Sequence, residues 1–216
     1  MASAHQKFSE DDLRQRVQRR LGGGIASAPA PQSGGDHELN PEWPEAEEHG
    51  PVRRPCAVLI PLTIHPAGAS VLLTRRSDHL PQHAGQIAFP GGKIGPQDRA
   101  PVNAALREAH EEIGLHPQFV DILGRLEDYR TATGFDIAPF LGIVRQGFSL
   151  VPDHNEVAEI LQVPLAFLMS SANHQIREVI WRGRPRRFYA MPYKKHYIWG
   201  ATAGILRRMY ERLYSE

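Results

Sequence analysis

The stretch AALREAHEEIGL, residues 104–115, places three glutamates within five positions: Glu108, Glu111 and Glu112. On a helical wheel with about 100° between residues, the apolar side chains of residues 102–113 share one stripe, which predicts a helix with one buried face. The glutamates share the shoulder beside this stripe, where like charges three or four positions apart oppose the helix by roughly 0.2–0.5 kcal/mol per pair. This shoulder is either a solvated acidic face or a site for a positive ligand.

The flanks of this stretch favour a ligand site. Pro101 suits the first turn of a helix and Gly114 suits the position just beyond its end, which predicts a helix over residues 101–113. The preceding loop FPGGKIGPQD, residues 89–98, would bring backbone carbonyls towards that helix. Carboxylates and carbonyls are hard oxygen ligands that suit Mg²⁺ or Mn²⁺, and the shortage of His and Cys in the cluster argues against zinc. We therefore predict a divalent-metal site.

The whole chain has the composition of a globular enzyme or binding domain. It has 216 residues, 41% of them hydrophobic, and its 25 Lys and Arg balance 24 Asp and Glu to a net charge of +1. This balance gives no basis for attraction to nucleic acid or membranes, and no apolar run approaches the about 18 residues of a spanning helix. The N-terminus lacks the apolar core of a secretory signal, so a cytoplasmic location is expected. The single cysteine, Cys56, lies in the apolar run CAVLIPL and is expected in the core.

Two regions are expected along the chain. Residues 8–21 have the pattern of a short amphipathic helix, with Ser9 as its N-cap. Residues 22–51 are rich in Gly, Pro, Ala and Ser, which predicts a linker or a loosely attached arm. We therefore expect residues 1–51 to form this helix and arm, and residues 52–216 to form one compact domain.

Strand-like and helical segments mingle within the expected domain. This mixed order favours an α+β fold, layered α/β/α around a mixed β-sheet, over a doubly wound parallel sheet. A hairpin is expected where EVIWRG and RRFYAMPY flank RP, and the tail YIWGATAGILRRMYERLY has apolar residues at helical spacing. Strands are expected at residues 57–65, 70–76, 86–92, 119–128 and 137–144, while residues 156–170 mix strand and helix.

The glutamate helix and its loop resemble a known motif. Gly92, five residues, Asp98 and then REAHEEIGL look like the box of the Nudix hydrolase family, G-x5-E-x7-R-E-U-x-E-E-x-G-U with U aliphatic. Two features depart from that pattern. Asp98 replaces the first glutamate, and eight residues instead of seven separate it from Arg107.

The resemblance implies a Nudix fold and hydrolysis of a nucleoside diphosphate linked to another group. Glu108, Glu111 and Glu112 would bind Mg²⁺ or Mn²⁺ together with a backbone carbonyl near Gly91 or Gly92. Arg107 would orient a glutamate and the loop. The general base lies in the box, at Glu108 or Glu111, or in a later loop, where Glu156 is the candidate. The alternative for Glu156 is an ordinary exposed loop glutamate.

A second segment narrows the substrate. LLTRRSDHLPQHAGQIAFPGG, residues 72–92, resembles the signature of the coenzyme A pyrophosphatases within that family, as does YIWGATAGIL near the C-terminus. This implies cleavage of coenzyme A or acyl-coenzyme A to 3′,5′-ADP and 4′-phosphopantetheine or its acyl form. We expect Arg75, Arg76, Gly85 and Phe89 to bind the substrate, although Phe89 equally suits the core.

Other readings remain open. The run RGRPRR, residues 182–187, offers cations for phosphates, and it equally suits a solvated hairpin tip. A broader hydrolase of ADP-ribose or dinucleotides is the alternative enzyme. A non-catalytic nucleotide sensor is the alternative from another class, although a sensor does not need the intact glutamates. The expected partner is a small-molecule substrate, with no nucleic acid and no membrane, and a homodimer remains open.

Overall fold

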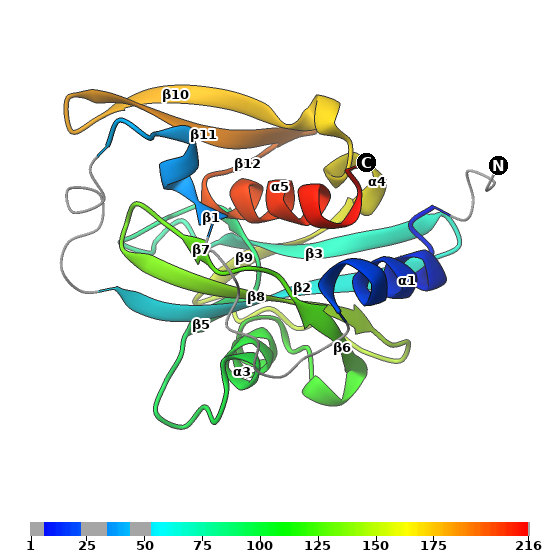
Figure 1. Ribbon diagram of the computed structural model, residues 1–216. Helices are drawn as coiled ribbons and strands as arrows, with labels where there is room; N and C mark the ends of the chain where they lie inside the picture. Colours follow the sequence, from blue (N-terminus) through cyan, green and yellow to red (C-terminus); the bar gives the residue numbers. More distant parts are fainter. Residues whose placement is uncertain (1–6, 23–33, 44–52, 216) are drawn as a thin grey trace.

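The computed structural model describes residues 7–22, 34–43 and 53–215. Its centre is a mixed sheet in which β2 and β8 run parallel, while β3 pairs antiparallel with β2. Helix α3 (Pro101–Ile113) covers one face, and α1 (Glu10–Leu21) and α5 (Ala201–Leu213) lie on the other (Figure 1). This confirms the α+β architecture. The strands of this sheet are β1 (Gly34–Gly35), β2 (Arg54–His65), β3 (Gly68–Arg76), β4 (Ile87–Ala88), β5 (Gly91–Lys93), β6 (Val120–Arg125), β7 (Tyr129–Arg130), β8 (Phe135–Val144) and β9 (Val157–Pro164).

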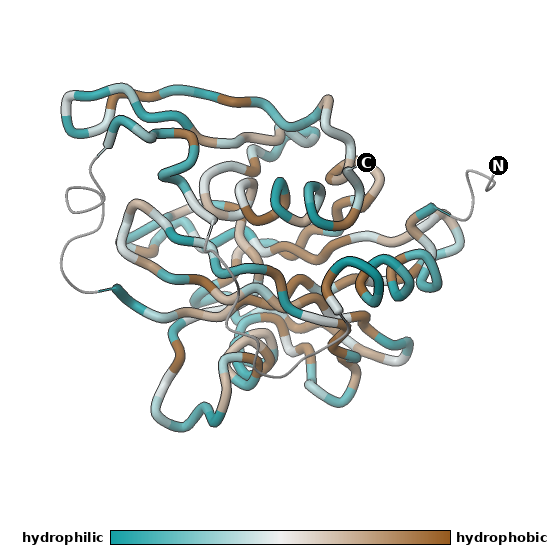
Figure 2. The backbone as a smooth tube through the Cα atoms, in the orientation of Figure 1, coloured by the Kyte–Doolittle hydropathy of each residue, from teal (hydrophilic) through white to brown (hydrophobic). Residues whose placement is uncertain are grey.

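Alternation along β2 explains how the sheet holds both helical layers. Ala57 and Leu59 belong to the core cluster that includes α3, whereas Ile60 and Leu62 belong to the cluster with α1 and α5. All four side chains are fully buried. A strand covered on both faces is apolar at successive positions, which accounts for the run AVLIPL. Figure 2 shows the same result for the whole sheet, with hydrophobic residues concentrated in the central strands.

Two sequence predictions need correction. Residues 86–92 do not form one strand, because β4 pairs with β3 whereas β5 pairs with β2. Between them the carbonyl of Pro90 accepts a hydrogen bond from the Leu59 N–H at 2.9 Å. The tail is not helical throughout either. It begins as β12 (His196–Trp199), and α5 starts only after Gly200, whose φ of 64° breaks the strand.

A second, three-stranded sheet lies beyond α5. Its order is β10, β11, β12, and the antiparallel β10–β11 pair is the hairpin that the sequence predicts. Met191 and Ile198 from this sheet are fully buried in the same core cluster as α5. Helix α5 is therefore enclosed between the two sheets. The remaining elements are β10 (Gln175–Trp181), β11 (Arg184–Tyr193), α4 (Leu165–Leu168), and the 3₁₀ turns η1 (Asp36–Leu39), η2 (Pro117–Phe119) and η3 (Ser171–Asn173).

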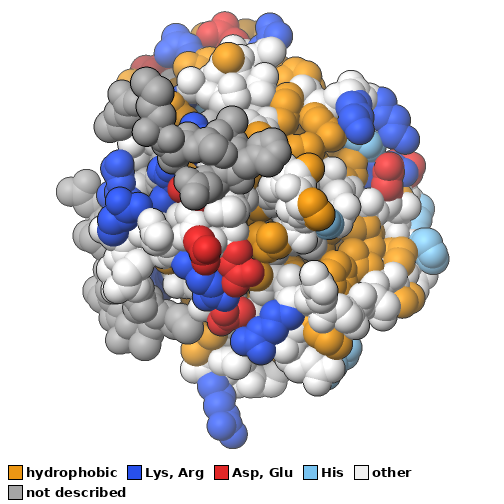
Figure 3. Space-filling view, turned by 90° about the vertical axis from the view of Figure 1, so that its right-hand side faces the viewer, with side chains coloured by type: hydrophobic (Ala, Val, Ile, Leu, Met, Phe, Trp, Pro, Cys, Tyr) orange, Lys and Arg blue, Asp and Glu red, His pale blue; other side chains and the backbone are white. Residues whose placement is uncertain are grey.

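The surface carries charges of both signs. On the face drawn in Figure 3, basic and acidic side chains lie beside one another, and no extended region of one sign is visible there. Within the described residues, no helix is long and apolar enough to cross a membrane.

The N-terminal helix is an integral part of the core. Ser9 caps it as predicted, because the Asp12 N–H donates to the Ser9 hydroxyl at 3.2 Å. Leu13 and Val17 are 0% and 2% exposed and pack in the cluster that contains α5. The helix therefore closes one side of the sheet.

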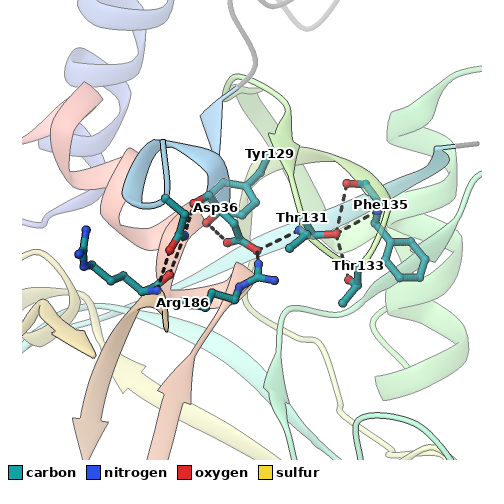
Figure 4. A network of polar contacts seen from close by, with 9 residues as sticks. Asp36, Tyr129, Thr131, Thr133, Phe135 and Arg186 are labelled. Atoms are coloured by element: carbon teal, nitrogen blue, oxygen red, sulfur yellow. Dashed lines mark hydrogen bonds and ion pairs between the residues drawn. The ribbon is translucent and has the colours of Figure 1, made fainter. Parts of the chain in front are cut away.

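Residues 34–43 form a strap that crosses from the large sheet to the small one. Asp36 accepts hydrogen bonds from the Tyr129 hydroxyl at 2.7 Å and from the Ala132 N–H at 3.1 Å, and it pairs with Arg186 of β11 at 2.8 Å. Figure 4 shows Asp36 between these partners, next to the turn around Thr131. The side chains of Asp36 and Arg186 are only 12% and 11% exposed, so this ion pair is largely withdrawn from water.

Two further residues hold the strap against β11. Asn40 is fully buried; its amide donates to the Arg187 carbonyl at 3.0 Å, and its side-chain oxygen accepts from the Arg187 N–H at 2.7 Å. The Trp43 indole N–H donates to the Pro185 carbonyl at 3.1 Å. The sequence prediction of a loosely attached arm is therefore wrong for residues 34–43. The rest of that predicted arm, apart from Gly22, lies outside the described residues.

Candidate active site

Helix α3 has the bounds that its sequence predicts. Pro101 occupies its first turn, and Gly114 ends it in the left-handed conformation with a φ of 70°. The Gly114 N–H donates to the His110 carbonyl at 2.9 Å, which satisfies one of the last free carbonyls of the helix. Its small inner residues let it lie close to the sheet, so the glutamate shoulder faces the loop that precedes the helix.

Glu112 is the most enclosed of the three glutamates. It is 6% exposed, and it accepts a hydrogen bond from the Gly91 N–H at 3.3 Å. Burial raises its pKa to about 8; the charges of Glu108 and Glu156 add to this effect, and the Gly91 hydrogen bond and the charge of Arg76 oppose it. Burial disfavours the charged form of this carboxylate. A bound cation would therefore stabilise the charged form strongly.

Glu108 lies against the backbone of Gly92. A β-carbon on Gly92 would sit 2.5 Å from the Glu108 carboxyl carbon, so any other residue there would push this carboxylate out of its present position. Burial is the main cause that raises the Glu108 pKa, and Arg107, 2.8 Å away, partly offsets it. Gly92 thus forms a cradle that holds the Glu108 carboxylate, an oxygen ligand.

Arg107 clamps the loop to the helix. Its guanidinium donates two hydrogen bonds to Asp98, both at 3.1 Å, and a third to the Lys93 carbonyl at 3.2 Å. Asp98 also accepts from the Gly95 N–H at 2.8 Å, and its side chain is only 3% exposed. These hydrogen bonds, chiefly those from Arg107, lower the Asp98 pKa. The aspartate that departs from the family pattern therefore holds the loop, a role that the sequence did not reveal.

Glu111 lies at the open rim of the site. Its side chain is 58% exposed, and it accepts a hydrogen bond from Arg107 at 2.9 Å. Across residues 7–22, 34–43 and 53–215, no three carboxylate, imidazole or thiol side chains converge closely enough to surround an ion already. The donor chemistry nevertheless fits Mg²⁺ or Mn²⁺, because carboxylate oxygens and the glycine cradle meet along one side of α3.

The loop that carries Glu156 is anchored to the same site. The Asp153 N–H donates to the Glu112 carbonyl at 2.9 Å, and the Ser77 N–H donates to the Glu156 carbonyl at 2.9 Å. The Glu156 side chain is exposed, and its charge raises the pKa of both Glu108 and Glu112. The two hydrogen bonds hold the loop beside α3, and Glu156 is near enough to act electrostatically on Glu108 and Glu112. A general base in a later loop would need such a position.

The four expected substrate-binding residues have different surroundings. Arg76 acts electrostatically on Glu112, and its buried Nε makes no hydrogen bond within the described part of the chain. Arg75 pairs with Asp78 at 2.7 Å. Gly85 has a φ of 68° and closes the intervening loop through a 3.2 Å hydrogen bond from its N–H to the Arg76 carbonyl. Phe89 is 4% exposed and packs in the core, which is the alternative that the sequence left open for it.

One acidic residue beside this segment escaped the sequence analysis. Glu159 of β9 lies opposite Arg75 of β3, with 3.7 Å between carboxylate and guanidinium. It also lies 3.6 Å from His196 of β12 and 3.8 Å from Lys195 in the turn before β12. Only strand pairing brings these groups together, so the chain order gives no signal of this cluster.

The arginine run RGRPRR lies on the other side of the molecule. The β10–β11 hairpin and α3 lie on opposite sides of the large sheet (Figure 1). Arg186 holds Asp36, and Arg187 pairs with Glu178 at 3.4 Å. At least these two arginines therefore have structural partners that lie far from the glutamates of α3.

The glycine cradle leads to a test of the site. Gly92→Ala should displace the Glu108 carboxylate and lower turnover about 10²-fold, because small misplacements of reacting groups have effects of that size. The fold should persist, since the clash falls on the end of a side chain. Gly91→Ala is the contrast, because its β-carbon would lie 2.5 Å from the backbone oxygen of Ala57 and should destabilise the sheet. Steady-state kinetics and thermal unfolding measure both; normal turnover in Gly92→Ala would refute the cradle.

Comparisons with known proteins agree with this geometry. Residues 53–181 match the model of the NUDIX domain. The chain is 39% identical over 157 residues to a Yersinia enterocolitica protein named uncharacterized Nudix hydrolase NudL, covering 73% of this chain and 80% of that protein. A Photorhabdus laumondii protein of the same name is 39% identical over 160 residues, which cover 74% and 85% of the two chains.

The fold also has a counterpart among solved structures. The protein DR0079 from Deinococcus radiodurans superposes with a TM-score of 0.50 over 76% of this chain and 84% of its own, at 12% identity. At that identity the likeness concerns the fold alone. The domain match and the two relatives are stronger, because the family model covers more than half of the chain and each relative is 39% identical to it over almost three quarters of its length. This chain therefore belongs to the Nudix hydrolase family.

Proposed function

We propose that this chain is a metal-dependent diphosphatase that cleaves coenzyme A or acyl-coenzyme A to 3′,5′-ADP and 4′-phosphopantetheine or its acyl form. The observation that carries the proposal is the path of residues 72–92. This signature segment runs as β3, loop, β4 and β5 straight into the glutamate site, where Gly91 binds Glu112 and Arg76 acts on the same carboxylate. The substrate-binding residues that we propose on this segment would therefore lie beside the metal-binding glutamates that we propose on α3.

Four groups would hold the metal. They are the carboxylates of Glu108, Glu111 and Glu112 and a backbone carbonyl near Gly91. When bound, Mg²⁺ or Mn²⁺ neutralises charge on the diphosphate oxygens and lowers the pKa of an attacking water. Arg107 positions this set, since it contacts Glu108 and Glu111 while it binds the loop through Asp98.

Glu156 is our candidate for the general base. A base must lie near the water that it deprotonates and must not be engaged elsewhere. Glu111 is already hydrogen-bonded to Arg107, and Glu108 lies within 2.8 Å of the same guanidinium. Glu156 is exposed, is fixed through its backbone, and its charge raises the pKa of both Glu108 and Glu112.

Arg75 and Arg76 are our candidates for binding substrate phosphates. Guanidinium groups recognise phosphate through paired hydrogen bonds. Arg76 has a buried Nε without a hydrogen bond in the described chain, and its charge already reaches the glutamate site. A diphosphate bound at this place would therefore meet positive charge on both sides. The Arg76 guanidinium would lie on one side, and the metal ion held by the glutamates would lie on the other.

A substrate panel tests the proposal. Purified protein with Mg²⁺ or Mn²⁺ should release 3′,5′-ADP from coenzyme A, detected by chromatography, and chelation should stop the reaction. ADP-ribose and dinucleotides serve as competing substrates, and acetyl-coenzyme A tests the acylated form. Preferred cleavage of ADP-ribose would favour the broader hydrolase, whereas binding without turnover would favour a nucleotide sensor. Either result would refute the coenzyme A assignment.

A cytoplasmic location stays a prediction.

A further inference from the structure

The first turn of α5 contacts the segment that we propose to bind the substrate. Thr202 in this turn is 6% exposed, and its hydroxyl donates a hydrogen bond to the Ile87 carbonyl of β4 at 3.0 Å. Strand β12 also lies beside β4, and the Gln86 side chain lies beside Gly200. Thr202 and Ile87 are 115 positions apart in the chain. The stretch YIWGATAGIL, which follows the end of the family match, is thus in direct contact with residues 72–92.

Strand β4 is short and depends on side chains for its position. It has two residues, and among the described strands it pairs with β3 alone. A threonine hydroxyl binds each of its two carbonyls, because Thr74 of β3 donates to Ala88 at 3.3 Å and Thr202 donates to Ile87. Both threonines are buried, so water does not readily replace either hydroxyl. A buried carbonyl without a partner is unfavourable, so loss of one hydroxyl should loosen β4.

The two ends of β4 have separate anchors. After β4, the Pro90 carbonyl accepts from the Leu59 N–H and β5 pairs with β2, which fixes the glycines beside the glutamate site. Before β4, the Gln86 carbonyl accepts from the Arg76 N–H at 3.0 Å, which fixes the end of β3. Thr202 binds the residue directly after Gln86. Its contact therefore supports the arginine end, whereas β2 supports the glutamate end.

We propose that Thr202 is a positioning residue for substrate binding, because its hydroxyl fixes β4 and β4 fixes the backbone of Arg76. This inference rests on the proposed role of Arg75 and Arg76 in binding the substrate. Helix α5 is a firm support, since it is enclosed between the two sheets and the Gly200 N–H before it donates to the Tyr189 carbonyl at 3.1 Å. Loss of the hydroxyl should weaken substrate binding and leave the chemical step and the metal requirement unchanged.

Thr202→Val tests this role, because valine keeps the shape of the side chain and lacks the hydroxyl. KM for the best substrate of the panel should rise about tenfold, equal to about 1.4 kcal/mol, while kcat and the Mg²⁺ concentration for half-maximal activity change less than about twofold. Thr202→Ser keeps the hydroxyl and should restore KM. Thr202→Ala also lacks the hydroxyl and favours a helix, so it replaces the valine variant if that variant does not fold.

Thr63→Val is the matched control. Thr63 is 1% exposed, and its hydroxyl donates to the Ser70 carbonyl at 3.4 Å, at the end of β2 that lies away from β5. Both valine variants lose a buried hydrogen bond, so both should melt a few degrees lower than the parent. Only Thr202→Val should raise KM. An equal rise in Thr63→Val would show a general effect of lower stability and would overturn the proposal.

Amide hydrogen exchange tests the positioning without a substrate. The Arg76 and Gly85 amides donate within the β3–β4 turn, whereas the Leu59 amide donates to Pro90. In Thr202→Val the first two should exchange about tenfold faster relative to Leu59, because local opening at β4 exposes them. In Thr63→Val this ratio should stay as in the parent. An unchanged ratio or an unchanged KM in Thr202→Val would overturn the proposal.

The substrate assignment can fail separately from this inference. If the parent cleaves a different diphosphate, KM for that compound gives the same comparison of variants. If the parent binds a nucleotide without turnover, the dissociation constant takes the place of KM. In both cases the coenzyme A assignment is refuted, while a weaker affinity and a changed amide ratio in Thr202→Val would still support the role of Thr202.

Discussion

Glu112→Gln is expected to abolish turnover, by a factor of about 10³ or more, in a chain that remains folded. Glutamine keeps the oxygen that accepts from the Gly91 N–H, so the local hydrogen bond survives the change. It removes the negative charge that the metal needs. Since Glu112 is 6% exposed, water does not easily replace the lost ligand.

The same substitution should stabilise the metal-free protein at alkaline pH. The Glu112 pKa is about 8 in the folded chain and 4.5 as the ordinary value. The folded state therefore binds this proton more tightly than the unfolded state. Its contribution to stability is full below about 4.5 and is lost as the pH rises through about 8. Glutamine stays neutral, so it should remove this loss.

Thermal unfolding with chelator at pH 5 and pH 9, together with turnover, checks both effects. The melting temperature of Glu112→Gln should exceed that of the parent at pH 9 and approach it at pH 5, with 1 kcal/mol corresponding to roughly 2–4 °C. Glu10→Gln, at the exposed start of α1, should change neither quantity. Near-normal turnover in Glu112→Gln would refute the metal-binding role.

Asp36→Ala is expected to destabilise the chain by about 3–5 kcal/mol, as breaking a buried ion pair does. It would leave Arg186 charged and 11% exposed, and it would remove the acceptor of the Tyr129 hydroxyl and the Ala132 N–H. Tyr129 is 5% exposed, so water would not readily satisfy its hydroxyl. The melting temperature should fall by about 10 °C.

Glu38→Ala is the matched control for this prediction. Glu38 lies on the same 3₁₀ turn and pairs with Arg208, but its side chain is 44% exposed. Exposed ion pairs contribute about 0–1 kcal/mol, so this change should alter the melting temperature little. Equal effects of the two substitutions would show that Asp36 has no special part in joining the two sheets.

Local signals in the sequence were sufficient for the elements that depend on them. Pro101 and Gly114 mark the ends of α3, and Ser9 marks the start of α1, because caps satisfy backbone groups through near neighbours. The continuous apolar run of β2 likewise identified a strand that is buried on both faces. These features involve residues that are close together in the chain.

Features that depend on distant partners were not predictable in this way. Residues 86–92 split because β3 and β2 each take part of the segment. Residues 34–43 are fixed by β7 and β11, whose positions no local pattern reveals. In the site, the box glutamates are recognisable from spacing, whereas the loop-holding role of Asp98 and the position of Glu159 depend on the folded arrangement.

Because α5 lies between the two sheets, the segment that matches the family model is shorter than the segment that the chain needs to fold. The family match ends at residue 181, before β11, β12 and α5. A fragment trimmed to that match would keep every glutamate of the box. It would also lose the buried side chains of Leu206 and Met209 and expose one face of its sheet. Such a fragment should aggregate, because large exposed apolar patches associate.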